Sequence, residues 1–239
     1  MIRHLKQTII LSMLIIVVIS VSNAESSPWQ SQIEANLGIT QNQLSDNWQG
    51  GGASGLAWVS SFNAQSEKQL SASLHWKHLL KLAFGQMHNQ DQDTKKWLSP
   101  VKSNDQIDYE TVLRITRGWF VDPVISGRLE TQFVDQTDPS KAHNFNPLRL
   151  SEAVGVARNL IKSENRIWDL RLGFVSRQII NDAYSDQSNP LPHRETIYDG
   201  GLQLDSDFKA PVSDRLSFAS KLTLTGDYQF EGGRVEWNA

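Results

Sequence analysis

The sequence predicts an all-β protein, an antiparallel up-and-down transmembrane β-barrel of about nine strands. Three features of the chain lead to this prediction: apolar and polar residues alternate, short and long connections alternate, and an export leader precedes both patterns. Alternation with a period of two places successive side chains on opposite faces of a strand. Connections sorted by length are typical of outer-membrane barrels, which have tight periplasmic turns and extended external loops.

Residues 1–24 have the features of a secretory signal. Basic Arg3 and Lys6 precede an apolar run over residues 9–19. The small residues Ser22 and Ala24 then form a cleavage-site pattern directly before Glu25. The run is shorter than the roughly 20 apolar residues that a membrane-spanning helix needs. We therefore expect removal of residues 1–24 on export and a single barrel domain over residues 25–239 in the bacterial outer membrane.

Strands are predicted wherever the alternation is sustained. In the first, residues 33–40, Ile33 and Leu37 interleave with Glu34 and Asn36. The same rule defines the strands at residues 56–65, 76–85, 107–119, 125–133, 168–174, 202–209 and 216–225.

Residues 148–161 fit two kinds of element. Leu150, Val154 and Ala157 recur at helical spacing, and Ser151 stands where a helix could be capped. We assign a strand, because a helix here would leave the neighbouring strands unpaired within a membrane.

The connections between these strands form two groups. The short ones are residues 67–73, 120–124, 162–166 and 210–214, and the long, polar ones are residues 42–54, 89–106, 135–147 and 181–199. Since the two groups alternate, all short turns are expected at one end of the sheet and all long loops at the other.

The alternation also predicts which face each side chain occupies. The expected lipid face carries Leu80, Leu82, Phe84, Leu113, Ile115, Leu170, Leu172 and Phe174. Charges on that face would cost about 2–4 kcal/mol each at the membrane midplane, so the charged residues should face the lumen and pair there. The predicted lumen network consists of Asp108, Glu110, Arg114, Arg128, Glu130, Arg158, Arg171, Asp205 and Lys209.

Composition excludes several functions. The chain has no Cys, which excludes disulfides and thiol chemistry. Its net charge is −3 and it has no cluster of basic residues, which argues against nucleic acid as a partner. Residues 50–55 satisfy G-x-G-x-x-G, but a strand pattern follows where a dinucleotide site needs a helix. His75 and His78 have odd spacing on a strand, which sends them to opposite faces and disfavours a shared metal. We therefore predict no cofactor and no metal.

The sequence favours a non-enzymatic barrel with a structural role or a role in passing a small solute. Its partners would be outer-membrane lipid and the barrel-assembly machinery. One alternative is a barrel-borne hydrolase in which His88, Asp91 and Asp93 activate water at the rim. A second is a soluble periplasmic lipocalin-like binder, with an apolar interior and a polar exterior.

Four segments resemble an uncharacterised family of predicted bacterial outer-membrane β-barrels, a domain of unknown function. They are NLGITQNQLSDNWQGGG from Asn36, KLAFGQ from Lys81, FVDPVISGRLETQF from Phe120 and DGGLQLDSDFKAPVSDRLSFASKLTL from Asp199. The resemblance runs over essentially the whole mature chain and implies a barrel in the outer membrane. It implies no catalytic residue and no ligand. Members of that family continue through further strands.

Nine strands is an odd number, whereas single-chain bacterial barrels use an even number. Val235 and Trp237 alternate as if a tenth strand began there, and the chain finishes on Ala239 rather than on an aromatic residue. These features predict a C-terminally incomplete barrel of ten or more strands. The sheet should then be open between the strands at residues 33–40 and 216–225.

Overall fold

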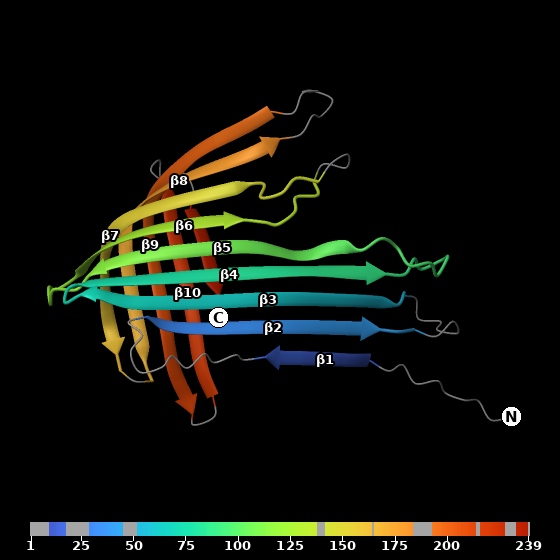
Figure 1. Cartoon of the computed structure of the whole chain (residues 1–239), viewed down its shortest axis with the longest axis horizontal. Coiled ribbons are helices and arrows are strands. Elements are labelled where there is room, and N and C mark those ends of the chain that lie inside the picture. Colours follow the sequence, from blue (N-terminus) through green and yellow to red (C-terminus); the bar gives the residue numbers. More distant parts are fainter. Residues whose placement is uncertain are drawn as a thin grey trace.

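The computed structural model describes residues 10–17, 29–44, 52–137, 142–163, 165–183, 193–213, 216–227 and 233–238. These residues form one antiparallel sheet in which each strand pairs with its neighbours in the chain (Figure 1). The strands are β1 (Ile10–Val17), β2 (Gln30–Asn42), β3 (Gly55–Ser71), β4 (Leu74–Asn89), β5 (Val101–Ile115), β6 (Asp122–Thr131), β7 (Leu148–Lys162), β8 (Ile167–Ala183), β9 (His193–Ser213), β10 (Leu216–Asp227) and β11 (Gly233–Asn238).

The predicted all-β, up-and-down fold is confirmed. The nine predicted strands correspond to β2 through β10, and residues 148–161 lie in strand β7. The tenth strand suggested by Val235 and Trp237 is β11, which pairs with β10. β1 falls within the predicted export signal, and its removal would leave β2 as an edge strand. The described residues include no helix with the length and apolarity of a membrane-spanning helix.

Connection lengths are sorted as expected. Residues 72–73, 116–121, 163–166 and 214–215 separate strands at one end of the sheet, and residues 43–54, 90–100, 132–147 and 184–192 separate them at the other. We call these the short-turn end and the long-loop end. Most strands are longer than predicted, because polar residues at the strand ends continue the pairing where the apolar alternation has stopped.

The sheet curls into an open half-barrel. Figure 1 shows β2 to β5 running side by side, with the sheet turning through β6 to β8 so that β9 and β10 lie behind them. Among the described residues, no strand pairing joins β1 or β2 to β10 or β11, which confirms the expected open sheet.

A pair of glycines lies where the sheet curls. Gly155 of β7 is directly opposite Gly173 of β8. A Cβ on Gly173 would lie 2.6 Å from the carbonyl oxygen of Val154, and one on Gly155 would collide with the carbonyl oxygen of Leu172. Bare backbone of this kind allows two strands to approach closely and a sheet to bend.

The two faces of the curled sheet differ in polarity. Apolar side chains on the convex face stay open to the surroundings, including Ile125 at 59%, Leu172 at 51% and Phe174 at 58% exposed. The strand registers place all eight residues of the predicted lipid face on this side. Charged and polar side chains occupy the concave face instead. Val124, Ala157 and Val175 are the only buried apolar residues in the described part of the chain.

Candidate functional site

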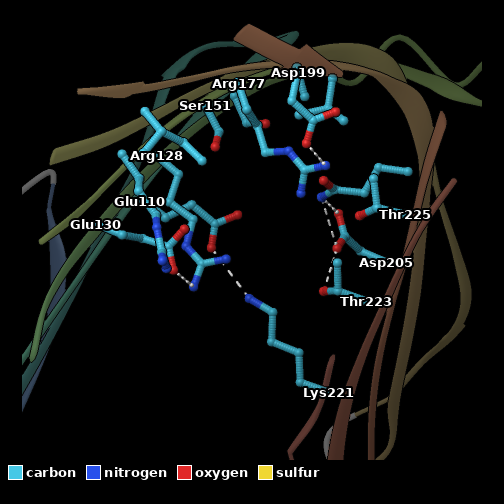
Figure 2. Close-up of a pocket in the computed structure, with 16 residues that line it drawn as sticks. Glu110, Arg128, Glu130, Ser151, Arg177, Asp199, Asp205, Lys221, Thr223 and Thr225 are labelled. Atoms are coloured by element: carbon cyan, nitrogen blue, oxygen red, sulfur yellow. Dashed lines mark hydrogen bonds and ion pairs between the residues drawn. The ribbon is translucent and has the colours of Figure 1, made fainter. Parts of the chain in front are cut away.

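The concave face holds a polar cavity of about 380 Å³ between β5 and β10. Figure 2 shows charged side chains from several strands pointing into it. Its charged lining residues are Glu110, Arg128, Glu130, Arg149, Arg177, Asp199, Asp205 and Lys221. Because alternate residues of six consecutive strands contribute, the cavity is a direct product of the period-two pattern and the curl.

Glu110 is the centre of the ion pairs that form the floor of this cavity. Its Oε1 accepts a hydrogen bond of 2.9 Å from Arg171 of β8, and its Oε2 accepts one of 3.3 Å from Lys221 of β10. These strands are far from β5 in the sheet order, so the contacts cross the half-barrel. The Arg171 and Glu110 side chains are only 13% and 15% exposed, which strengthens their mutual attraction.

A second set of ion pairs lies nearer the short-turn end. Arg114 donates through Nε to Asp122 at 2.9 Å and through Nη1 to Asp169 at 2.8 Å. Nη1 also contacts the side-chain oxygen of Asn159 at 3.3 Å. Both sets lie on the concave face, one at the cavity and one between the cavity and the short-turn end.

The cavity wall is also paired. Arg128 donates two hydrogen bonds, of 2.9 and 3.0 Å, to the carboxylate of Asp108 and contacts Glu130 at 3.1 Å. Such a two-pronged contact fits the planar guanidinium to a carboxylate.

The opposite wall carries two further carboxylates. Asp205 accepts hydrogen bonds from Gln203 at 2.9 Å and from Thr223 at 2.7 Å. Asp199 accepts one of 2.7 Å from Arg177. Every carboxylate that lines the cavity therefore has a partner.

Seven of the nine predicted network residues take part in these contacts: Asp108, Glu110, Arg114, Arg128, Glu130, Arg171 and Asp205. They divide into three sets, around Arg114, Arg128 and Arg171, and no ion pair among the described residues joins one set to another.

The prediction is wrong for Arg158, which is not in the lumen. Its register partner is Leu170, whose side chain is on the convex face. The guanidinium lies 3.7 Å from the ring centroid of Phe120. Even-numbered residues of β7 alternate outward together with Val154 and Val156, so the same alternation that placed the other charges inside places Arg158 outside.

Lys209 keeps the predicted face but joins no ion pair in the described part of the structure. It is exposed and lies opposite Ile167, at the beginning of β8 and the short-turn end. Its distance from the cavity explains why it does not contribute.

Sequence reasoning missed four charged partners: Asp122, Asp169, Asp199 and Lys221. Asp169 shares the face of Arg171 and Lys221 shares that of Thr223, so the alternation could have identified both. Asp122 begins a strand and Asp199 follows a polar stretch, where the apolar pattern gives no face.

The predicted rim cluster is not assembled as a catalytic site. Oδ1 of Asp91 accepts hydrogen bonds of 2.7 Å from both the backbone N–H and the hydroxyl of Thr94. These bonds, the backbone one first, hold the pKa of the Asp91 carboxyl below its usual range. The ring of His88 packs against Trp97 at 4.9 Å, and no contact joins it to Asp91 or Asp93 within the described residues.

The two other candidate sites can be placed as well. His75 pairs in register with Arg114 and His78 with Thr111, which puts them on opposite faces as expected. Among the described residues, no group of three or more His, Asp or Glu is arranged to hold a metal. Of the glycine-rich stretch, residues 50–51 lie outside the described residues, and Gly55 begins strand β3 rather than a helix.

Comparison with known protein families gives a match over part of the chain. The family model described as "Protein of unknown function (DUF3078)" matches residues 39–136, from the end of β2 to just beyond β6. No curated protein and no solved structure matches the chain. The match is shorter than the resemblance expected from the sequence, because it leaves out the segment that begins at Asp199. It supports an uncharacterised domain family for the part of the chain that contains β3 to β6.

Proposed function

We propose that this protein is exported to the bacterial outer membrane, where the half-barrel forms a barrel wall with a structural role or a role in passing a small solute. The observation that carries the proposal is the reversed polarity of the sheet. Large apolar side chains are exposed on the convex face, and charged side chains are paired on the concave face. A lipid-facing wall requires this arrangement.

A soluble lipocalin-like binder requires the opposite arrangement. Its interior would hold the apolar side chains, and its exterior would carry the charges. Here Asp108 and Asp205 are buried on the concave side while Ile125 and Phe174 are more than half exposed on the convex side. Exposed apolar area of this extent is an aggregation hazard in water.

Aromatic side chains on the convex face form two bands that suit the two membrane interfaces. At the short-turn end, Trp76 packs against Trp29 at 5.9 Å and against His78 at 4.3 Å. At the long-loop end, Phe84 packs against Trp58 at 5.9 Å and against Phe133 at 6.2 Å.

The separation of the bands fits a bilayer. Trp76 and Phe84 are eight residues apart on β4, or about 26 Å along the strand. With a strand tilt of about 40°, this becomes roughly 20 Å across the membrane, close to the apolar band of known barrels, which is about 25 Å tall.

The paired lumen favours a structural role or passage of small solutes over a wide aqueous pore. Ion pairs cross the half-barrel between β5 and β8 and between β5 and β10. Open porins use 16 or more strands, and narrower barrels are filled by their own side chains. A hydrolase function gains no support from the rim residues, since Asp91 is held in a turn and His88 is against Trp97.

Heat-modifiable gel mobility tests the proposal directly. The full chain, expressed with residues 1–24, should fractionate with the outer membrane and migrate differently when boiled. Planar-bilayer recording should give small or no conductance steps. Recovery of a soluble periplasmic monomer would overturn the membrane assignment, and large steady conductance would overturn the paired lumen.

A further inference from the structure

Two guanidinium groups of the cavity have donors to spare. Nε of Arg177 is buried and has no hydrogen-bond partner within the described structure. Arg149 lines the same cavity and forms no ion pair or hydrogen bond with another described residue, although Glu130 lies opposite it in register. A buried donor without a partner is unfavourable, so the Nε of Arg177, unlike the exposed Arg149, points to a group that is bound there.

The carboxylates of the cavity do not use these donors. Glu130 pairs with Arg128, Asp199 with the Nη2 of Arg177, and Glu110 with Arg171 and Lys221. Asp205 is held by Gln203 and Thr223. The charged lining is balanced, with four carboxylates and four cations, but the hydrogen-bonding groups left over are N–H donors of Arg149 and Arg177.

The two spare groups are neighbours. Ser151 of β7 is directly opposite Arg177 of β8, and Arg149 is two residues before Ser151 on the same face. Diagonal positions of this kind are about 7–8 Å apart between Cα atoms, a span that long side chains bridge. Figure 2 shows Ser151 next to Arg177 at the cavity wall, so the cavity wall also carries a hydroxyl.

We propose that this cavity binds a small oxyanion, a phosphate or a carboxylate, between Arg149, Arg177 and Ser151. Planar guanidinium groups bind such anions through charge-assisted hydrogen bonds, and Ser151 adds a neutral donor. The volume of about 380 Å³ suits a small molecule. The ion pairs of Glu110 and Arg114 lie on the short-turn side of the site, so in a closed barrel the anion would enter from the long-loop end. Only this direction rests on the proposed membrane function.

Calorimetric titration of the full chain, folded in detergent, with inorganic phosphate and separately with acetate at constant ionic strength tests the site. We expect saturable binding of at least one anion. Arg149→Gln should weaken it at least tenfold, and Arg177→Lys, which keeps the charge but loses the Nε donor, should also weaken it. Lys209→Gln is the matched control, because it removes an unpaired cation from the same face outside the cavity, and it should change affinity less than twofold.

A second measurement covers variants that do not fold. In the parent protein, the Nε–H resonance of Arg177 should shift on addition of the anion that binds. Absence of saturable binding by the parent, or equal losses in Arg149→Gln and Lys209→Gln, would overturn the site. Since heat-modifiable mobility is scored on the same samples, failure of anion binding is distinguishable from failure of the membrane proposal.

Discussion

Two regions of the sheet, β2 to β4 and β5 to β10, differ in the charged side chains on their concave faces. Across β2 to β4, the concave side chains are mostly neutral, and the carboxylates of the described part of these strands contact only Asn36, at 2.8 Å from Glu34, and His75, at 3.8 Å from Glu67. Across β5 to β10, carboxylates and guanidinium groups are joined at 2.7–3.9 Å into a network. Both regions consist of antiparallel strands that pair with their neighbours in the chain.

The difference shows that curvature and charge pairing depend on each other. Glu110 can meet Lys221 only because the sheet turns enough to bring β10 across from β5 (Figure 1). In the flatter region, Lys81 shares the concave face with Asn63 and Asp108, and Arg128 already holds Asp108. Charges are therefore concentrated where another strand can neutralise them.

The largest loss of stability is expected from removing Arg171, which pairs with Glu110 and Asp205. Arg171→Gln leaves Glu110 and Asp205 without their guanidinium partner, and removing one member of such a low-exposure pair costs about 3 kcal/mol. Lys81→Gln, in the flat region, should change the free energy of unfolding by less than about 0.5 kcal/mol. Urea unfolding in lipid vesicles, followed by Trp fluorescence, measures both.

The double variant Glu110→Gln/Arg171→Gln checks the cause of that loss. It removes both charges, so it should recover part of the stability that Arg171→Gln loses. Equal effects of Arg171→Gln and Lys81→Gln would contradict the distinction between the two regions.

The next largest loss of stability is expected at the glycine pair where the sheet curls. Gly155→Val places side-chain atoms against the Leu172 carbonyl and the Gly173 backbone, which should destabilise the fold by about 2 kcal/mol through overpacking. Gly127→Val is the matched control, since the nearest atom to a Cβ there is the Thr111 methyl carbon at 3.7 Å. Thermal unfolding that moves equally for both variants would show that close approach at Gly155 is unimportant.

A smaller loss is expected from Arg128→Ala. The substitution leaves the buried Asp108 without its two-pronged partner, but Arg128 is 31% exposed, so water can replace part of the contact. We expect a loss of about 1–2 kcal/mol. Arg158→Ala removes the same group from the convex face and should cost less than about 1 kcal/mol. A more stable Arg128→Ala protein with large bilayer conductance would contradict the paired lumen.

Much of the fold could be predicted from alternation because each strand of a single curled sheet has one apolar and one polar face. This pattern alone predicts Leu80, Leu113 and Phe174 on one apolar face, which is the convex face in the structure. Strand ends were less accurate, since backbone pairing continues through polar residues such as those after Gln65. The ambiguous stretch with Val154 required a second argument, the pairing of neighbouring strands.

The pairing of charges could be predicted only in part. Alternation gives a face but no curvature, so it could not show that Glu110 meets Lys221 across the half-barrel. It also could not separate the Arg114 set from the Arg171 set, since both lie on one face. Arg158 shows a different limit: its charge suggested the lumen, while its position in β7 puts it with Val156 outside.

The smallest loss of stability is expected from substitutions of tryptophan on the convex face, which test whether the two regions differ there as well. Trp76 in the flat region donates to the Thr111 hydroxyl at 2.9 Å, and Trp168 in the curled region donates to the Ser206 hydroxyl at 3.1 Å. Because the convex face is alike in both regions, Trp76→Phe and Trp168→Phe should each lose one such hydrogen bond, about 1 kcal/mol, while the ring contacts remain. Unfolding in vesicles measures both, with fluorescence from the remaining Trp residues. Losses that differ by more than about 1 kcal/mol would mean that the curl changes the convex face too, and that the two regions differ in more than their concave charges.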